Sequence, residues 1–270
     1  MIDFGVDKPD LSPQCYAASD PRPSAVLWGD SHADALAPAL RQIANTEGYN
    51  FIEMTKAGCL PLKGAVSYDW GHPVVAGTCM HYNDEVLNLI AADHRIRIVI
   101  IAGRWEAPFF EGNTNPLITD LAHERDRPSP ESVPSTFVKS LSAAIQSLQR
   151  VDKHVIVIDD VPNFEFDPLC KVRTAAIPAR RTMAALLGLD TDSHGVAPRG
   201  FVSASNQSTN LLRQIREANR GVELIDLESS LCNSQNLCAY MDGGRLLYSD
   251  ADHLTADGAR YALRSFLLPH

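Results

Sequence analysis

The strongest constraint on the fold is a set of five short, nearly continuous runs of apolar, largely β-branched residues. Longer segments separate the runs, and in these segments apolar residues recur at helical spacing. The runs are SAVLW at 24–28, FIEM at 51–54, RIVIIA at 97–102, HVIVI at 154–158 and VELI at 222–225. Buried strands that alternate with amphipathic helices are typical of a parallel sheet covered on both faces. We therefore predict a three-layer α/β/α, flavodoxin-like sandwich with a mainly parallel five-stranded sheet.

The spacing of apolar residues also indicates where the helices lie and how the chain divides. The expected helices are residues 34–44, 83–92, 135–149, 205–219 and 255–267. Residues 1–23 contain four prolines and little periodicity, which favours a linker or extended lead-in. The remainder, residues 24–270, is predicted to form one domain, with a proline-rich surface excursion at 106–134.

Charge and hydropathy argue against some classes of protein. The formal net charge is −9, whereas nucleic-acid-binding domains usually carry a basic face. No apolar run reaches the roughly 18–20 residues that span a bilayer. The first residues have neither the basic start nor the apolar core of a signal peptide. We therefore expect the chain as given to be soluble and not to bind nucleic acid.

A serine follows the first predicted strand. Gly29-Asp30-Ser31 lies between this strand and the next helix, and ligands of parallel sheets sit beyond the carboxyl ends of the strands. A serine there places its hydroxyl at the sheet edge, and its N–H lies at a helix N-terminus. These are features of an acyl-transfer nucleophile, although Gly-Asp-Ser is also a common turn and helix-capping sequence.

A histidine with neighbouring aspartates lies near the end of the chain. Asp250 precedes His253 by three residues, with Asp252 between them. A serine nucleophile needs a base, and the imidazole needs an acceptor that fixes its tautomer. Because adjacent side chains in an extended loop point apart, we expect Asp250 to orient His253 and Asp252 to face solvent or the last helix. A metal site formed by these three residues is an alternative, but it requires further ligands.

These elements together resemble the SGNH (GDSL-like) hydrolase superfamily, from about Ser24 to the end of the chain. The nucleophile comes first and the Asp/His pair last, and Gly58 follows the second strand. The resemblance implies a Ser31–His253–Asp250 triad, with the N–H groups of Ser31 and Gly58 as oxyanion hole. One subgroup is especially similar, namely the SGNH domains fused to membrane acyltransferase-3 proteins. The matching segments are LWGDSH at 27–32, KAGC at 56–59, IAGRW at 101–105, the cysteine pair 232/238, and YSDADHLT at 248–255.

Resemblance to this subgroup implies a specific function. Its members O-acylate bacterial surface glycans in the periplasm. The expected partners are therefore a carbohydrate acceptor and an acyl donor delivered by a membrane acyltransferase domain, to which residues 1–23 would be the linker. No cofactor and no metal are expected. A free-standing carbohydrate acetylesterase with the same residues, or a non-catalytic glycan-binding module, are the alternatives.

One turn departs from the superfamily pattern. The wider family has an oxyanion-hole asparagine after the third strand, whereas this chain has Gly103-Arg104-Trp105. Arg104, with Trp105, is therefore a possible substrate or oxyanion contact, or else hydrolysis is slow. A structural stack or salt bridge of Arg104 and Trp105 is the competing interpretation. His32 is interpreted as a helix-start residue without a catalytic role.

The six cysteines contain no C-x-x-C pair, which argues against a zinc ribbon. Two interpretations stay open, namely buried thiols in a cytosolic protein and disulfides in an oxidising compartment. For disulfides, Cys232 and Cys238 are the first pair, because a short polar loop joins them. Cys59 with Cys79, which bracket an excursion after the second strand, is the next pair. Cys15 with Cys170 follows only by elimination.

Overall fold

The computed structural model describes residues 9, 20–68, 73–109, 117–120, 131–189, 194–200 and 202–269. Within these ranges, no helix is long and apolar enough to cross a membrane. Most of the expected linker at 1–23 lies outside the described residues.

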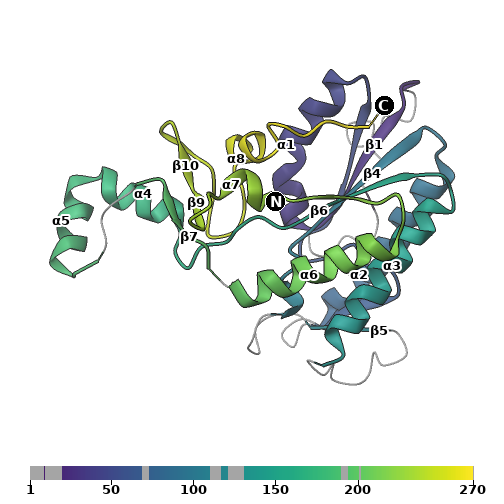
Figure 1. Cartoon of the computed structure of the whole chain (residues 1–270), viewed down its shortest axis with the longest axis horizontal. Helices are drawn as coiled ribbons and strands as arrows, with labels where there is room; N and C mark the ends of the chain where they lie inside the picture. Colours follow the sequence, from purple (N-terminus) through teal and green to yellow (C-terminus); the bar gives the residue numbers. More distant parts are fainter. Residues whose placement is uncertain are drawn as a thin grey trace.

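The central sheet has five parallel strands, which confirms the predicted fold class (Figure 1). Their order is β2-β1-β4-β6-β8, so the first strand is internal. The strands are β1 (Ser24–Gly29), β2 (Asn50–Thr55), β4 (Ile96–Ala102), β6 (His154–Ile158) and β8 (Glu223–Ile225). All five carboxyl ends therefore meet at one edge of the sheet.

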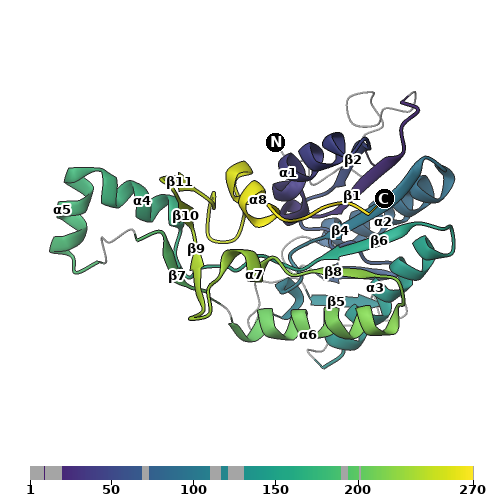
Figure 2. The same ribbon diagram turned by 45° about the horizontal axis from the view of Figure 1, so that its top comes forward.

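Helices cover both faces of this sheet, because successive side chains of a buried strand point to opposite sides (Figure 2). Ala25 and Leu27 of β1 belong to the core under α1 (Ser31–Thr46) and α8 (Ala256–Ala262). Val26 and Trp28 belong to the opposite core. The helices over that second core are α2 (Pro73–Ala92), α3 (Val133–Gln149) and α6 (Val202–Ala218).

Several small elements were not expected from the sequence. Three antiparallel pairs lie outside the main sheet. They are β3 (Ala65–Tyr68) with β5 (Leu117–Asp120), β7 (Val196–Pro198) with β9 (Leu237–Ala239), and β10 (Met241–Asp242) with β11 (Arg245–Leu246). Two short helices accompany them, η1 (Ala107–Phe109) and α7 (Glu228–Leu231).

A pair of helices projects from the body of the molecule at the left of Figures 1 and 2. It consists of α4 (Pro168–Ala176) and α5 (Pro178–Leu186). Neither helix was predicted, since their small and polar residues lack a clear core-facing stripe. We call residues 168–189 the helical arm.

Two of the three predicted disulfides are present. Cys59 is bonded to Cys79, and Cys232 to Cys238. The pairing of Cys15 with Cys170 is not formed, because Cys170 carries a free, exposed thiol on α4. Cys15 itself lies outside the described residues. Elimination failed as a criterion because it assumed that every cysteine has a partner.

Candidate active site

Ser31 is the first residue of α1, directly beyond the end of β1. The turn that places it requires glycine, since a Cβ at Gly29 would lie 1.8 Å from the carbonyl oxygen of Ala102 on β4. Asp30 caps the helix, and its Oδ1 accepts a hydrogen bond from the N–H of His32 at 2.9 Å. Its Oδ2 accepts one from the N–H of Arg104, also at 2.9 Å. Asp30 therefore holds the turns after β1 and β4 together.

The structure brings Ser31, His253 and Asp250 into one hydrogen-bonded chain. Ser31 Oγ lies 2.9 Å from His253 Nε2, although the two residues are 222 positions apart. On the other side of the ring, His253 Nδ1 lies 3.0 Å from Asp250 Oδ2. The imidazole is therefore placed to accept the serine proton while a carboxylate accepts from its Nδ1–H. This is the arrangement that activates a serine nucleophile.

Asp252 does not point away from His253, so this expectation was wrong. Its Oδ1 lies 2.9 Å from His253 Nδ1, and its Oδ2 pairs with an Arg104 guanidinium nitrogen at 2.6 Å. The reason is local. Asp250 Oδ1 accepts the backbone N–H groups of Asp252 and His253, at 3.0 and 2.7 Å. These bonds bend the segment into a turn, where the alternation rule for extended chains does not apply.

The two aspartates differ in their surroundings. The Asp252 side chain is 15% exposed and the Asp250 side chain 48%. Burial raises the pKa of the Asp252 carboxyl, but its hydrogen bond to His253 and the charge of Arg104 outweigh this and hold it well below its usual range. In return, the hydrogen bond that His253 donates to Asp252 raises the pKa of His253. Asp252 is thus a second ionised carboxylate at the same imidazole nitrogen.

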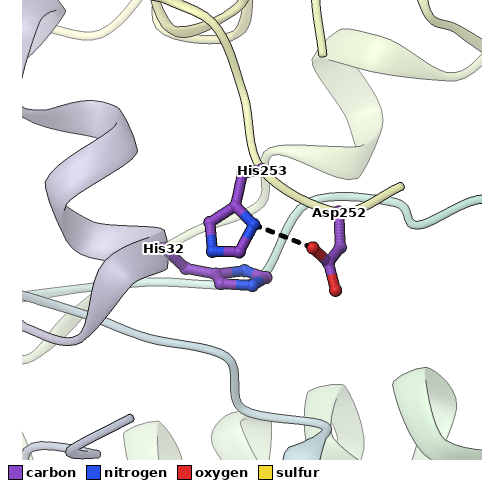
Figure 3. A group of neighbouring side chains, drawn as sticks. All are labelled: His32, Asp252 and His253. Carbon is purple, nitrogen blue, oxygen red and sulfur yellow. Dashed lines mark ion pairs between the residues drawn. The ribbon is translucent and has the colours of Figure 1, made fainter. Parts of the chain in front are cut away.

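His32 lies against the His253 imidazole and does not serve only as a helix-start residue (Figure 3). Its ring centroid is 4.5 Å from that of His253, and the residue is 6% exposed. Its Nδ1 lies 2.8 Å from Asp160 Oδ1. Burial lowers the pKa of His32, but the charge and hydrogen bond of Asp160 reverse this and raise it to about 9. At neutral pH a buried cation therefore lies beside His253.

Arg104 and Trp105 have separate roles in the structure. Trp105 is fully buried, and its Nε1–H donates to the carbonyl oxygen of Ile158 at 2.7 Å. It therefore cannot be a substrate contact, and the structural interpretation holds for this residue. Arg104 pairs with Asp252 through its guanidinium and with Asp30 through its N–H. Its backbone donor is thus engaged within the protein.

Gly58 lies in the turn after β2, as expected for an oxyanion donor. The N–H of Cys59 donates to the carbonyl oxygen of Lys56 at 3.1 Å, and Gly58 has a φ of +69°. Such a backbone angle favours glycine. The disulfide between Cys59 and Cys79 anchors the turn, and a Cβ at Gly58 would meet no atom within 4 Å. The Gly58 turn is thus held in place and faces open space.

Within the described ranges, one group of side chains has the composition of a metal site. It consists of His32, Asp252 and His253, whose ligand atoms lie within 4.8 Å of one another (Figure 3). The sequence had suggested Asp250 as the third member. The charges of Arg104 and protonated His32 oppose a cation here, and Ser31 occupies His253 Nε2. These residues fit a charge-balanced hydrogen-bond network better than a metal centre.

Sequence reasoning missed two buried acids of this network. Asp160 holds His32, and Glu106 accepts from Asn163 at 2.5 Å and from the Ser205 hydroxyl at 2.6 Å. Burial raises the pKa of Glu106 to about 7. A signal was available, because Glu106 and Asp160 lie in the turns that follow the third and fourth predicted strands, at the same sheet edge as Ser31.

The family model described as "SGNH domain (fused to AT3 domains)" matches residues 3–267. The periplasmic domain of a lipopolysaccharide acetyltransferase from Salmonella ser. Paratyphi A superposes with a TM-score of 0.64 at 16% identity, over 96% of this chain and 89% of that one. At this identity the likeness shows a common fold.

Two further solved structures are more distant. A putative acylhydrolase from Bacteroides fragilis has a TM-score of 0.47 at 12% identity, over 93% of this chain and 91% of that one. The acetyl xylan esterase AlAXEase has a TM-score of 0.45 at 13% identity, over 91% and 99%. A search of curated proteins by sequence found no match.

Proposed function

Because the chain belongs to the family of SGNH domains fused to AT3 domains, we propose that it transfers an acetyl group to a hydroxyl of a bacterial cell-surface glycan. Membership assigns it to acyl-transfer and ester-hydrolysis chemistry in general. The observation that carries the proposal is the hydrogen-bonded chain from Ser31 through His253 to two carboxylates at the carboxyl edge of the sheet.

In the first half of the proposed reaction, Ser31 Oγ attacks the carbonyl carbon of the acyl donor. His253 Nε2 takes the hydroxyl proton, and the N–H groups of Ser31 and Gly58 hold the negative oxygen. The bond to the leaving group then breaks, and His253 returns the proton to that group. Asp250 orients His253 and stabilises its charge, and Asp252 is a second acceptor at the same nitrogen. The product is an acyl ester on Ser31.

In the second half, a sugar hydroxyl gives its proton to His253 and attacks the ester. Ser31 leaves with the proton and is regenerated. Water at the same position releases the free acid, which is weak esterase activity. A free-standing acetylesterase would use only this branch. The turn Gly103-Arg104-Trp105 supplies no asparagine donor, so we expect hydrolysis to be slow, and transfer is proposed ahead of the esterase alternative on family membership.

A polar cavity supports a carbohydrate acceptor. It has a volume of about 290 Å³ and is lined mostly by amide, carboxylate and guanidinium groups, among them Asp159, Arg199, Asn206, Asn210, Arg213 and Asp226. Such groups can hydrogen-bond sugar hydroxyls. The cavity adjoins the ends of β6 and β8, and strands are spaced about 4.8 Å apart, so it is roughly 10–15 Å along the edge from Ser31. An acceptor of more than one sugar would reach both.

The two disulfides fit the proposed periplasmic location, since disulfides persist in oxidising compartments. A membrane acyltransferase domain, to which the family model refers, would deliver the acyl donor there. The cavity has a polar lining, which does not suit an apolar acyl chain. This agrees with an acyl donor that another domain delivers.

The test is to trap the acyl-enzyme. Wild-type protein incubated with an activated acetyl ester should gain one acetyl group on Ser31, seen by peptide mass spectrometry, and Ser31→Ala should lose both the label and about 10⁴-fold or more of the turnover. A variant of an exposed serine that does not line the cavity, Ser265→Ala, is the control. Turnover should rise with pH to a midpoint above 6.5, because His253 must be neutral to act and its pKa is raised. Unchanged turnover in Ser31→Ala would contradict the proposal.

A further inference from the structure

The helical arm exposes an unusual share of apolar surface. Nine large hydrophobic residues are exposed among the described residues, and five of them lie in the arm or at its end. These five are 41–78% exposed and comprise Ile177, Met183, Leu186, Leu187 and Leu189. Neither hydrophobic core contains a residue of α5. The arm thus presents side chains to solvent that a globular domain normally buries.

Three of these five apolar side chains lie on one side of the helix that begins as α5. Met183, Leu186 and Leu187 are spaced i, i+3 and i+4, so they share a side of the helix. Ala184, the buried residue of α5, follows Met183 directly and lies about 100° around the helix from it. The exposed stripe is therefore a consequence of helical geometry rather than of local unfolding.

The arm is also basic, in a chain whose net charge is −9. Between residues 168 and 189 there are four cations and no Asp or Glu, namely Lys171, Arg173, Arg180 and Arg181. Arg180 and Arg181 are exposed and begin the same helix that carries the apolar stripe. A helix with an exposed apolar face and flanking arginines is typical of segments that lie in a membrane interface.

The base of the arm is joined to the catalytic loop. The N–H of Phe164, just before the arm, donates to the carbonyl oxygen of Ala251 at 2.9 Å. The Phe164 ring packs edge-on against Tyr248, with centroids 5.0 Å apart. The arm follows β6, so it leaves the body from the same edge of the sheet as Ser31 (Figures 1 and 2). Whatever binds the arm is therefore held on the side of the active site.

We propose that the helical arm docks on an anionic phospholipid surface. Met183, Leu186 and Leu187 enter the boundary between headgroups and acyl chains, and Arg180 and Arg181 lie among the phosphates. Charge complementarity selects this partner, because the arm has no acidic residue and anionic headgroups repel the remainder of the chain. Docking directs the carboxyl edge of the sheet toward the membrane.

Vesicle flotation of the chain tests this proposal. Vesicles of phosphatidylglycerol and phosphatidylethanolamine should carry wild-type protein, vesicles of phosphatidylcholine should not, and added salt should weaken binding. Arg180→Gln with Arg181→Gln should weaken binding about 25-fold, since each cation near an anionic surface contributes roughly a factor of five. The triple variant Met183→Ser, Leu186→Ser and Leu187→Ser should abolish flotation, because it removes the apolar stripe.

Matched controls lie elsewhere on the surface. Arg216→Gln with Arg220→Gln removes two exposed arginines, one in the last turn of α6 and one just beyond its end, and Leu267→Ser removes an exposed leucine near the C-terminus. These variants should float like wild type. Turnover of a small soluble ester should be unchanged in all of them, which shows that each is folded.

Three results would overturn the proposal. They are absence of flotation with anionic vesicles, equal flotation of the arm variants and wild type, and flotation that does not depend on lipid charge. Arm-dependent self-association in sedimentation analysis, with no vesicle binding, would instead assign the arm to a second copy of the chain. Because the readout is lipid binding, the test stands whether or not Ser31 is the nucleophile.

Discussion

The residues around Ser31 and those of the helical arm differ in their exposure to solvent. Asp30, His32 and Glu106 are at most 6% exposed, and each has a partner within the protein. In the arm, Arg180 and Leu186 are both exposed. Burying a charge is costly unless it is paired, so the catalytic edge holds a fixed arrangement that the fold must support. In the arm, apolar and charged side chains instead remain exposed to solvent.

The largest effect should come from removing both carboxylates from His253. Asp250→Asn combined with Asp252→Asn should lower turnover of an activated ester by about 10⁴-fold, because no acceptor then fixes the imidazole tautomer. Each single variant keeps one carboxylate about 3 Å from Nδ1 and should lose less. Asp257→Asn, which alters an exposed pair with Arg260 on α8, is the control. If one single variant is as slow as the double variant, that aspartate is the sole orienter.

The buried His32 should make stability depend on pH. Its pKa of about 9 in the folded protein lies above the unfolded value of 6.5. Its contribution is therefore fully present below pH 6.5 and is lost as the pH rises through 9, by on the order of 3 kcal/mol. In urea unfolding, the advantage of wild type over His32→Gln should shrink between pH 6 and pH 9.5. A constant difference for His32→Gln would mean that His32 is not protonated in the fold.

The two disulfides should differ in their effects. Cys59→Ala with Cys79→Ala opens a loop of separation 20 and should cost about 3 kcal/mol, compared with about 2 kcal/mol for Cys232→Ala with Cys238→Ala, of separation 6. Only the first pair adjoins Gly58, so only its loss should also slow ester turnover. Equal effects of the two pairs on turnover would argue against Gly58 as an oxyanion donor.

The smallest effect should be in the arm. Leu186→Ser and Leu187→Ser should each change the free energy of unfolding by no more than about 0.5 kcal/mol, because both side chains are already exposed. The matched core variant is Leu40→Ala on α1, whose side chain is 1% exposed and which should cost about 2–5 kcal/mol. Destabilisation of the arm variants to a similar extent would show that the arm packs on the body.

Periodicity was enough to predict the sheet, because its internal strands bury both faces and are therefore almost entirely apolar. Val26 and Leu27 enter different cores, as expected for a sheet that is covered on both faces. The rule that carboxyl ends of parallel strands share one edge then placed Ser31 and Gly58 near each other. The helical arm was not predicted, because a pair of helices that buries few side chains has no core-facing pattern of apolar residues.

The sequence by itself therefore determined the layers and the order of the chemistry-bearing turns, which follow from local spacing, and it only ranked the two disulfides that form above the pairing that does not. Tertiary structure decided which side chains meet. Asp252 turns inward because Asp250 accepts two backbone N–H groups and bends the loop, and His32 becomes a buried cation because Asp160 from a distant strand lies 2.8 Å from its ring. Burial and charge pairing depend on atoms far apart in the chain, so neither could be derived from spacing alone.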